Sequence, residues 1–203
     1  MRARVIVLAG PSGSGKSRLS RRLGLPVLNL DDFYKDGSDP SLPRLEMGLV
    51  DWDHPDSWLR EEALDAIEAL CREGSSAVPV YNIAHDGRTG HQTLSLDGSG
   101  FFVAEGIFAH EVVELCAGRD LLADAICVRH HRVVTFWRRL TRDLKERRKP
   151  PHVLVRRGLM LLRAEPAVVA RAVARGCAAM TPEQAYRRVR ALTGSAARPG
   201  TPR

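Results

Sequence analysis

An eight-residue glycine-rich segment near the start of the chain constrains its fold more than any other feature. Residues 10–17 read GPSGSGKS and match the pattern G-x-x-x-x-G-K-[ST] at every fixed position. The glycines let backbone N–H groups curl around an anion without a Cβ in the way. Lys16 supplies a mobile positive charge for terminal phosphates, and the Ser17 hydroxyl can ligate Mg²⁺. The segment therefore predicts a phosphate-binding loop (P-loop).

The residues on either side of this loop support the prediction. Residues 4–9 (RVIVLA) predict a buried strand, and residues 15–23 predict a helix. A strand, a loop and a helix in this order place the positive end of the helix dipole at the phosphates. We therefore expect the phosphates of a nucleotide to contact Gly10, Pro11, Ser12, Gly13, Ser14, Gly15, Lys16, Ser17 and Arg18.

Length and cysteine usage indicate a single cytoplasmic domain. A chain of 203 residues can bury a full core. Its four cysteines form no C-x-x-C pair, so we expect reduced thiols and neither a disulfide framework nor a zinc site. The first predicted strand leaves no room for a signal peptide, and no apolar run approaches the ~18 residues of a membrane span. We therefore expect no membrane association.

Short apolar runs alternate with helical patterns along the chain. Strands are predicted at 4–9, 26–30, 77–81, 101–105 and 123–128, and helices at 15–23, 57–73, 109–117, 132–147, 153–174 and 182–192. This alternation predicts an α/β fold of the P-loop NTPase type, a three-layer sandwich in which helices cover both faces of a parallel sheet of about five strands. Residues 34–54 and 82–98 are rich in Gly, Pro and Asp and predict long loops.

Positive charge is concentrated in one segment. The net charge is +7, and residues 129–163 hold twelve Arg or Lys residues against two acids, Asp143 and Glu146. A diffuse basic coat would favour nucleic-acid binding. One basic segment beside a P-loop favours a phosphate clamp, with a solvated helical face as the alternative interpretation.

Two carboxylates follow predicted strands, at the edge where an open α/β sheet binds its ligand. Asp31 ends the second predicted strand, where it can accept the proton of an attacking hydroxyl; a turn aspartate is the alternative. Its neighbour Asp32 is expected to be structural. Glu105 ends the strand 101–105, where it can hold Mg²⁺ through water. A plain strand-end acid is the alternative interpretation of Glu105.

Further candidates lie in the basic helix. Arg138 and Arg142 share one face of the predicted helix, at i and i+4. A mobile basic helix of this kind can close over a triphosphate, exclude water and neutralise developing charge.

Two polar loops carry candidates for binding a second substrate. Asp53 can accept hydrogen bonds from the vicinal hydroxyls of a sugar. Tyr81 and His85 can stack on a ring or hydrogen-bond to it, although a lone loop histidine is commonly just solvated.

Together these residues resemble the uridine kinase family of P-loop nucleoside kinases. The P-loop is shared by many families, whereas D-x-F-Y followed by [FW]-D-H-P-D is much more specific. The matching segments run in the family's order across residues 1 to about 149: GPSGSGKS (10–17), Asp31-Asp32-Phe33-Tyr34, Trp52-Asp53-His54-Pro55-Asp56, Pro79-Val80-Tyr81 with Arg88, Glu105-Gly106-Ile107, and the arginine-rich run from Arg138 to Arg147.

The resemblance implies a role for each matching residue. Asp31 would be the catalytic base and Lys16 would act on the transferring phosphate. Asp53 would hold the ribose hydroxyls, Tyr34, Tyr81 and Arg88 would line the acceptor pocket, Glu105 would serve Mg²⁺, and Arg138 and Arg142 would belong to the lid. Beside what the resemblance implies, we expect His85 to contact the acceptor, Ser17 and Asp31 to contribute to the Mg²⁺ site, and Arg147 to contact the nucleotide.

Several departures from the family's pattern weaken uridine as the substrate but leave the kinase class intact. The family places its histidine five residues after the tyrosine, whereas His85 comes at four and Asp86 takes the fifth place. Thr135 stands where the lid normally begins with an extra arginine, and Glu146 is followed by RRK instead of R-G-R. The expected closing strand is absent from the pattern, and residues 153–192 are predicted to be helical.

The sequence thus predicts a kinase that uses ATP (or GTP) and Mg²⁺ to phosphorylate a nucleoside-like hydroxyl, with uridine and cytidine first. Another small alcohol, such as nicotinamide riboside, pantothenate or a sugar phosphate, is the related alternative. A regulatory GTPase-type switch is disfavoured because the guanine-binding motif N-K-x-D is absent from the sequence. A nucleic-acid-binding module is disfavoured because few aromatic residues interleave the basic segment.

The pattern along the chain sets the expected domain organisation, with the lid placed by the resemblance. We expect one kinase domain over residues 1–192, with a lid at about 132–152 and an extra helical segment over 153–192. Residues 193–203 are predicted to be a disordered tail. The sequence leaves the oligomeric state open, a homo-oligomer included.

Overall fold

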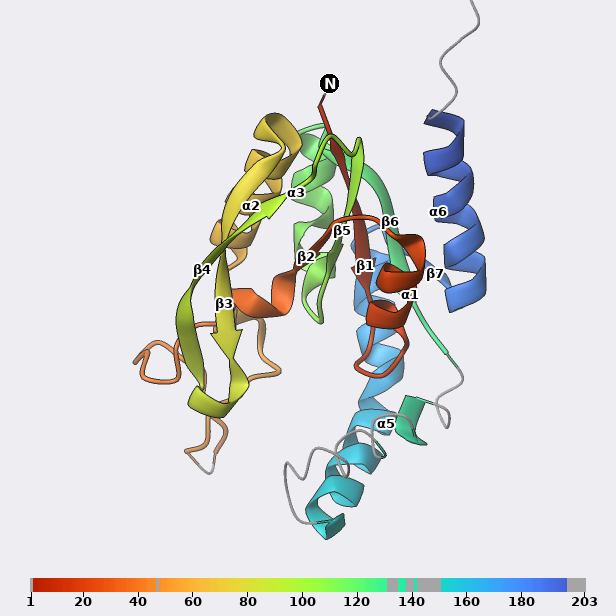
Figure 1. Cartoon of the computed structure of the whole chain (residues 1–203). Helices are drawn as coiled ribbons and strands as arrows, with labels where there is room; N and C mark the ends of the chain where they lie inside the picture. Colours follow the sequence, from red (N-terminus) through yellow and green to blue (C-terminus); the bar gives the residue numbers. More distant parts are fainter. Residues whose placement is uncertain (1, 47, 131–134, 138–140, 142–150, 197–203) are drawn as a thin grey trace, which may run out of the picture.

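A parallel five-stranded sheet forms the centre of the protein (Figure 1). The computed structural model describes residues 2–46, 48–130, 135–137, 141 and 151–196. The strands lie in the order β2-β5-β1-β6-β7, and every neighbouring pair is parallel. Their bounds are β1 Arg4–Ala9, β2 Val27–Asn29, β5 Phe101–Glu105, β6 Leu122–Val128 and β7 Ala178–Met180. The predicted α/β architecture with a parallel sheet is confirmed.

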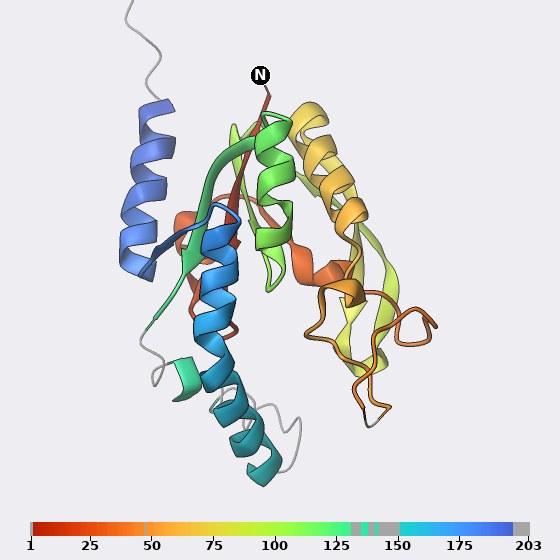
Figure 2. The ribbon, with the colours of Figure 1, turned by 180° about the vertical axis from the view of Figure 1, so that it is seen from behind.

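Helices cover both faces of this sheet. Side chains alternate along β1, so Val5 and Val7 point into one hydrophobic cluster and Ile6 and Leu8 into the other. The first cluster packs against α2, α3 and α5, which lie in front of the sheet in Figure 2, and the second against α1 and α6. The helices are α1 Lys16–Leu23, α2 Arg60–Glu73, α3 Val113–Gly118, α5 Pro151–Ala174 and α6 Pro182–Ala196.

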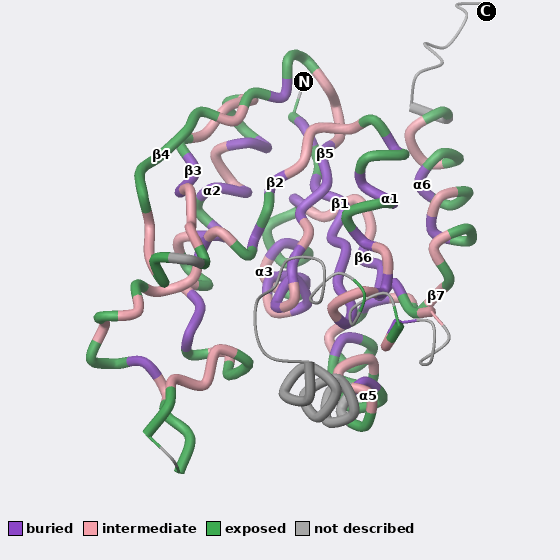
Figure 3. The backbone as a smooth tube through the Cα atoms, turned by 60° about the horizontal axis from the view of Figure 1, so that its bottom comes forward, coloured by how far each residue is buried: buried purple, intermediate pink, exposed green. Residues whose placement is uncertain are grey.

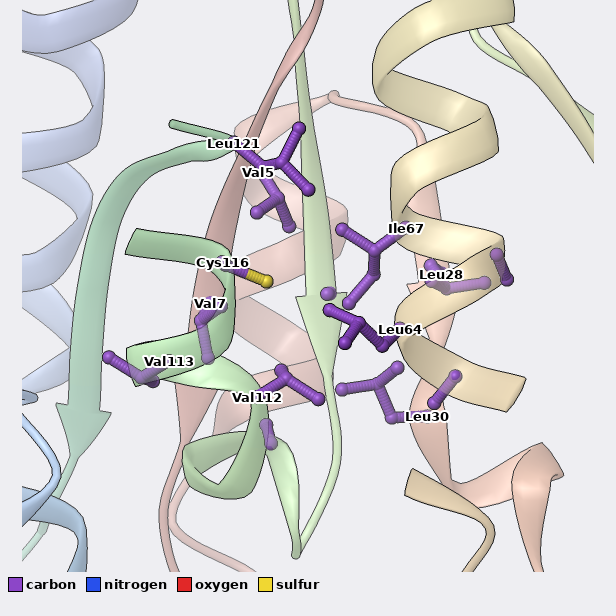
Figure 4. Packing of buried hydrophobic residues seen from close by; sticks show 14 of the residues in the cluster. Val5, Val7, Leu28, Leu30, Leu64, Ile67, Val112, Val113, Cys116 and Leu121 are labelled. Atoms are coloured by element: carbon purple, nitrogen blue, oxygen red, sulfur yellow. The ribbon is translucent and has the colours of Figure 1, made fainter. Parts of the chain in front are cut away.

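The larger cluster lies between α2 and α3. Figure 4 shows Leu64 and Ile67 of α2 facing Val112, Val113 and Cys116 over one face of the sheet. These residues are almost fully buried. In Figure 3 buried residues are purple, and they gather along the central strands and the helix faces that cover them. Burial of this kind stabilises the fold by about 25 cal/mol per Å² of apolar surface. The core therefore holds the strand ends in fixed relative positions.

A β-hairpin lies outside the main sheet. β3 (Ser75–Asn82) pairs antiparallel with β4 (Gly87–Ser95), and a short 3₁₀ turn, η3 (Ile83–His85), joins them. The predicted strand 77–81 therefore exists but belongs to this hairpin, and the prediction of a long loop over 82–98 is wrong. The strand β4 is largely exposed, so its sequence GRTGHQTLS carries no apolar alternation that would reveal it.

The C-terminal region also differs from the prediction. β7 pairs parallel with β6, through Ile126 and Ala178, and supplies the fifth strand that the sequence pattern did not show. Three residues are too few to display a hydrophobic period. Helix α6 continues to Ala196, so the tail predicted from Thr193 is helical over its first four residues, and residues 197–203 lie outside the described part.

The predicted lid falls almost wholly outside the described residues. Of the helix predicted over 132–147, the structure describes Thr135, Phe136, Trp137 and Thr141, all of which are helical. None of the helices in the described ranges is both long and apolar enough to cross a membrane.

A buried histidine on the α3 side of the sheet predicts a pH dependence of stability. Burial lowers the pKa of His110, with Arg171 and Arg175 acting in the same direction and Glu111 opposing them. Because its pKa is lower in the folded than in the unfolded chain, the unfolded chain binds more protons as the pH falls through about 6.5. This contribution to stability is therefore present at neutral pH and lost on acidification.

We expect the thermal unfolding midpoint to fall between pH 7.5 and 5.5, and to fall less in His110→Gln. The exposed His91 on β4 provides the matched control, and His91→Gln should retain the wild-type pH dependence. Identical pH profiles for His110→Gln and the wild type would contradict the assignment.

Candidate active site

The P-loop joins β1 to α1 in a conformation that only glycine adopts easily. Gly10 has φ 135° and Gly15, which caps α1, has φ 100°. A Cβ on Gly10 would also collide with the carbonyl oxygen of Val128, at the end of β6. The predicted loop is therefore present, and the packing of β6 against it requires Gly10.

The lysine of the loop lies over the loop itself. Lys16 is the first residue of α1 and is 8% exposed. Its Nζ donates hydrogen bonds to the carbonyl oxygens of Gly10, at 2.8 Å, and Pro11, at 3.3 Å. Phosphate oxygens can take over these bonds because they are stronger, charged acceptors.

The strand register brings the predicted acids to the same edge as the P-loop. Glu105, the last residue of β5, is level with Leu8 of β1 and with Asn29 of β2. The Ser17 hydroxyl is hydrogen-bonded to Glu105, and Lys16 and Asp31 both interact electrostatically with it. The structure therefore brings Lys16, Ser17, Asp31 and Glu105 together in one site.

The environment of Glu105 suits a hydrated divalent cation. Burial is the main cause that raises the pKa of Glu105, while Ser17 and Lys16 lower it and Asp31 raises it further. Among the described residues, no group of three or more His, Cys, Asp or Glu forms a protein-only metal cage. Mg²⁺ is typically held by one or two protein oxygens together with substrate phosphates and water. The oxygen atoms of Ser17 and Glu105 fit that requirement.

Asp31 is held in a defined orientation by the backbone around it. It lies in a 3₁₀ turn, η1 (Leu30–Phe33), directly after β2. Its Oδ1 accepts a hydrogen bond of 2.9 Å from the backbone N–H of Ile107. Gly106 permits this approach, because a Cβ there would lie 2.8 Å from the same oxygen. Asp31 is otherwise exposed, so its second oxygen can reach a substrate.

Four aromatic side chains form a wall beside Asp31, which we call the aromatic wall. The Tyr34 ring contacts the rings of Trp52, Tyr81 and Phe108 at centroid distances of 5.7, 5.9 and 6.0 Å. The Tyr34 hydroxyl donates to the carbonyl oxygen of Trp52 at 3.2 Å. Sequence reasoning selected Tyr34 and Tyr81 but missed Trp52 and Phe108, although Trp52 lies in the W-D-H-P-D segment.

The remaining predicted acceptor residues are placed differently from one another. Arg88 is paired through both Nη atoms with the Glu62 carboxylate of α2, at 2.8 and 2.7 Å. His85 is exposed at the turn of the hairpin, and Asp53 is exposed in the loop before α2. The predicted lid residues Arg138, Arg142 and Arg147 lie outside the described residues.

A cavity of about 340 Å³ adjoins the P-loop on its α6 side. Arg22 on its border pairs with Glu183 at 2.6 Å and stacks 3.7 Å above the Tyr186 ring. No local sequence pattern indicates this cavity, because its wall combines α1 with the first residues of α6. The lining residues are Gly15, Arg18, Leu19, Arg22, His130, Thr181, Pro182 and Glu183.

The fold and the site together define a kinase of the P-loop class. Residues 5–154 match the model of the phosphoribulokinase/uridine kinase family, and the chain belongs to this family. It is 32% identical over 167 residues to a uridine kinase from Deinococcus deserti, covering 78% of this chain and 77% of the relative. It is 31% identical to a uridine kinase from Bacillus pumilus, covering 70% of this chain and 69% of the relative.

A solved structure shares the fold. A candidate fructose transport system kinase from Silicibacter sp. TM1040 superposes with a TM-score of 0.62. The match covers 83% of this chain and 85% of that one at 19% sequence identity. At this identity the likeness shows a common architecture and leaves the substrate undetermined.

Proposed function

We propose that this protein transfers the γ-phosphate of ATP to a hydroxyl of a nucleoside, with the 5′-hydroxyl of uridine or cytidine as the first candidates. One observation carries the proposal: Lys16, Ser17, Asp31 and Glu105 converge at the edge of the sheet beside the aromatic wall. The uridine kinases among its relatives support the choice of acceptor.

The residues divide the reaction between them. The acceptor oxygen attacks the γ-phosphorus while the bond to the β–γ bridging oxygen breaks, and the acceptor proton passes to the free oxygen of Asp31. The Ile107 N–H keeps the other Asp31 oxygen in place. Lys16 and the backbone N–H groups of the P-loop offset the phosphate charge. Mg²⁺ held by Ser17 and Glu105 would supply further neutralisation.

The aromatic wall favours a neutral ring-bearing acceptor. Tyr34 and Tyr81 offer aromatic faces and edges against which a base can pack. The guanidinium of Arg88 on β4 is already neutralised by Glu62, so its charge is not available to an anionic acceptor. This pairing favours a nucleoside over a sugar phosphate.

A panel of acceptors tests the proposal. Purified protein, ATP and Mg²⁺ are incubated with uridine, cytidine, nicotinamide riboside, pantothenate and a sugar phosphate, and products are identified by mass spectrometry. We expect monophosphates of uridine or cytidine. Phosphorylation of the sugar phosphate alone would contradict the acceptor assignment, and no product with any alcohol would contradict the proposed function.

The cavity beside the P-loop is proposed to receive the nucleoside part of the donor. Arg22→Ala removes one wall of the cavity together with the guanidinium that stacks on Tyr186. We therefore expect the KM for ATP to rise about tenfold, equivalent to a loss of about 1.4 kcal/mol in binding free energy. The KM for the acceptor should be unchanged in steady-state kinetics. Arg187→Ala is the matched control, because Arg187 also pairs with Glu183, at 3.4 Å, but does not line the cavity. Equal effects of both substitutions would contradict the assignment.

A further inference from the structure

We propose that Asn29 is a positioning residue for phosphoryl transfer, whose side-chain amide fixes the turn that carries Asp31 and ties it, through Asp32, to the aromatic wall. Asn29 is the last residue of β2 and stands directly before η1. The inference rests on the proposed function, in which Asp31 accepts the proton of the acceptor.

The Asn29 amide binds both acidic neighbours at once. Its Oδ1 accepts a hydrogen bond of 3.3 Å from the backbone N–H of Asp31, as the N-cap of the turn. Its Nδ2 donates a hydrogen bond of 2.9 Å to Asp32 Oδ2. Only an amide offers an acceptor and a donor in one plane at this reach. The side chain therefore fixes the position of Asp31 and the orientation of Asp32 together.

Asp32 continues this connection to the hairpin. It is partly buried, and its carboxylate accepts a hydrogen bond from the backbone of Tyr81 as well as the one from Asn29. Tyr81 belongs to β3, and its ring is part of the aromatic wall. The chain Asn29–Asp32–Tyr81 thus joins the turn bearing the proposed base to the wall that would hold the acceptor.

The consequence is a distinct kinetic signature. Asp31 keeps its bond from the Ile107 N–H when Asn29 is altered, so the carboxylate stays in the site but its turn loses its cap. Misplacement of a reacting group by about 1 Å can cost about 100-fold in rate. Binding of ATP depends on the P-loop, which the Asn29 side chain does not contact through these bonds. We therefore expect kcat to fall and the KM for ATP to remain.

A double-substitution cycle tests this inference. In Asn29→Asp a carboxylate faces the Asp32 carboxylate, and the donor of the hydrogen bond between residues 29 and 32 is lost. In Asp32→Asn we expect the new amide to donate to the Asn29 oxygen, so that this oxygen no longer caps Asp31. The double variant exchanges the two groups. The carboxylate now at position 29 caps Asp31 and accepts a hydrogen bond from the amide now at position 32. The oxygen of that amide still accepts a hydrogen bond from the backbone of Tyr81. We expect each single substitution to lower kcat about 10- to 100-fold with the KM for ATP within about threefold.

The double variant is expected to recover kcat to within about fivefold of the wild type, a strongly non-additive result. Thermal unfolding of all four proteins separates misfolding from misplacement. If both single variants fail to fold, the double variant still decides, because a folded but inactive double variant overturns the inference. Wild-type kcat in both single variants also overturns it.

Absence of product with every acceptor in the wild type overturns the proposed function as well, whereas additive losses in an active enzyme overturn the positioning role alone.

Discussion

Replacing Asp31 with Asn is expected to lower kcat by about 10²- to 10⁴-fold, the contribution typical of a general base. The Asn oxygen can keep the hydrogen bond from the Ile107 N–H, so the side chain retains its place. The amide that replaces the free oxygen cannot accept a proton. ATP affinity, measured by calorimetry, should change by no more than about threefold, because the P-loop contacts remain.

Asp120→Asn is the matched control for this substitution. Asp120 is exposed and adopts a left-handed conformation, with φ 55°, that Asn tolerates as well as Asp. Its kcat should equal that of the wild type. Phosphoryl transfer by Asp31→Asn at a rate near that of the wild type would show that another group takes the acceptor proton.

Replacing Gly10 with Ala should be the most destructive change in the phosphate-binding loop. The added Cβ collides with the carbonyl oxygen of Val128, and φ 135° is unfavourable for any residue with a side chain. We expect a loss of about 3 kcal/mol or more in the free energy of unfolding, together with a large loss of ATP binding. Chemical denaturation measures the first and calorimetry the second.

Gly24→Ala separates strain from collision. Gly24 also has a positive φ, 68°, but an added Cβ there meets no heavy atom within 4 Å. Its substitution should cost about 1 kcal/mol and leave ATP binding unchanged. Equal destabilisation by Gly10→Ala and Gly24→Ala would mean that β6 moves aside for the added Cβ without cost, and would contradict the requirement for glycine at position 10.

The edge of the sheet that carries the candidate site could be predicted because its signals are local. The glycine pattern fixes the P-loop, and parallel strands end at one edge, so Asp31 and Glu105 were placed together from sequence alone. In the structure the Asp31 carboxylate is near enough to raise the pKa of Glu105. The roles assigned to these residues remain predictions for the experiments above.

Other parts of the site depend on partners that are distant in the sequence. Arg88 meets Glu62 from 26 positions away, and Arg22 meets Glu183 from 161 positions away. No local pattern reports such pairings. The sequence therefore predicts contact between Arg88 and the acceptor but does not reveal that Glu62 of α2 already neutralises the Arg88 guanidinium. The cavity beside the P-loop likewise depends on the fold.

The regular elements that were missed lack a hydrophobic period for a physical reason. β4 is exposed along most of its length, so burial does not select apolar residues there. β7 is short, and its place in the sheet comes from backbone pairing with β6, to which any residue except proline can contribute.

A crystal structure with a non-hydrolysable ATP analogue, Mg²⁺ and the acceptor identified by the panel would test the central claim most directly. We predict the γ-phosphate beside Lys16, the cation beside Ser17 and Glu105, and the acceptor hydroxyl between the γ-phosphate and the free oxygen of Asp31. An acceptor bound with its hydroxyl out of reach of Asp31, or a cation bound away from Glu105, would contradict the account.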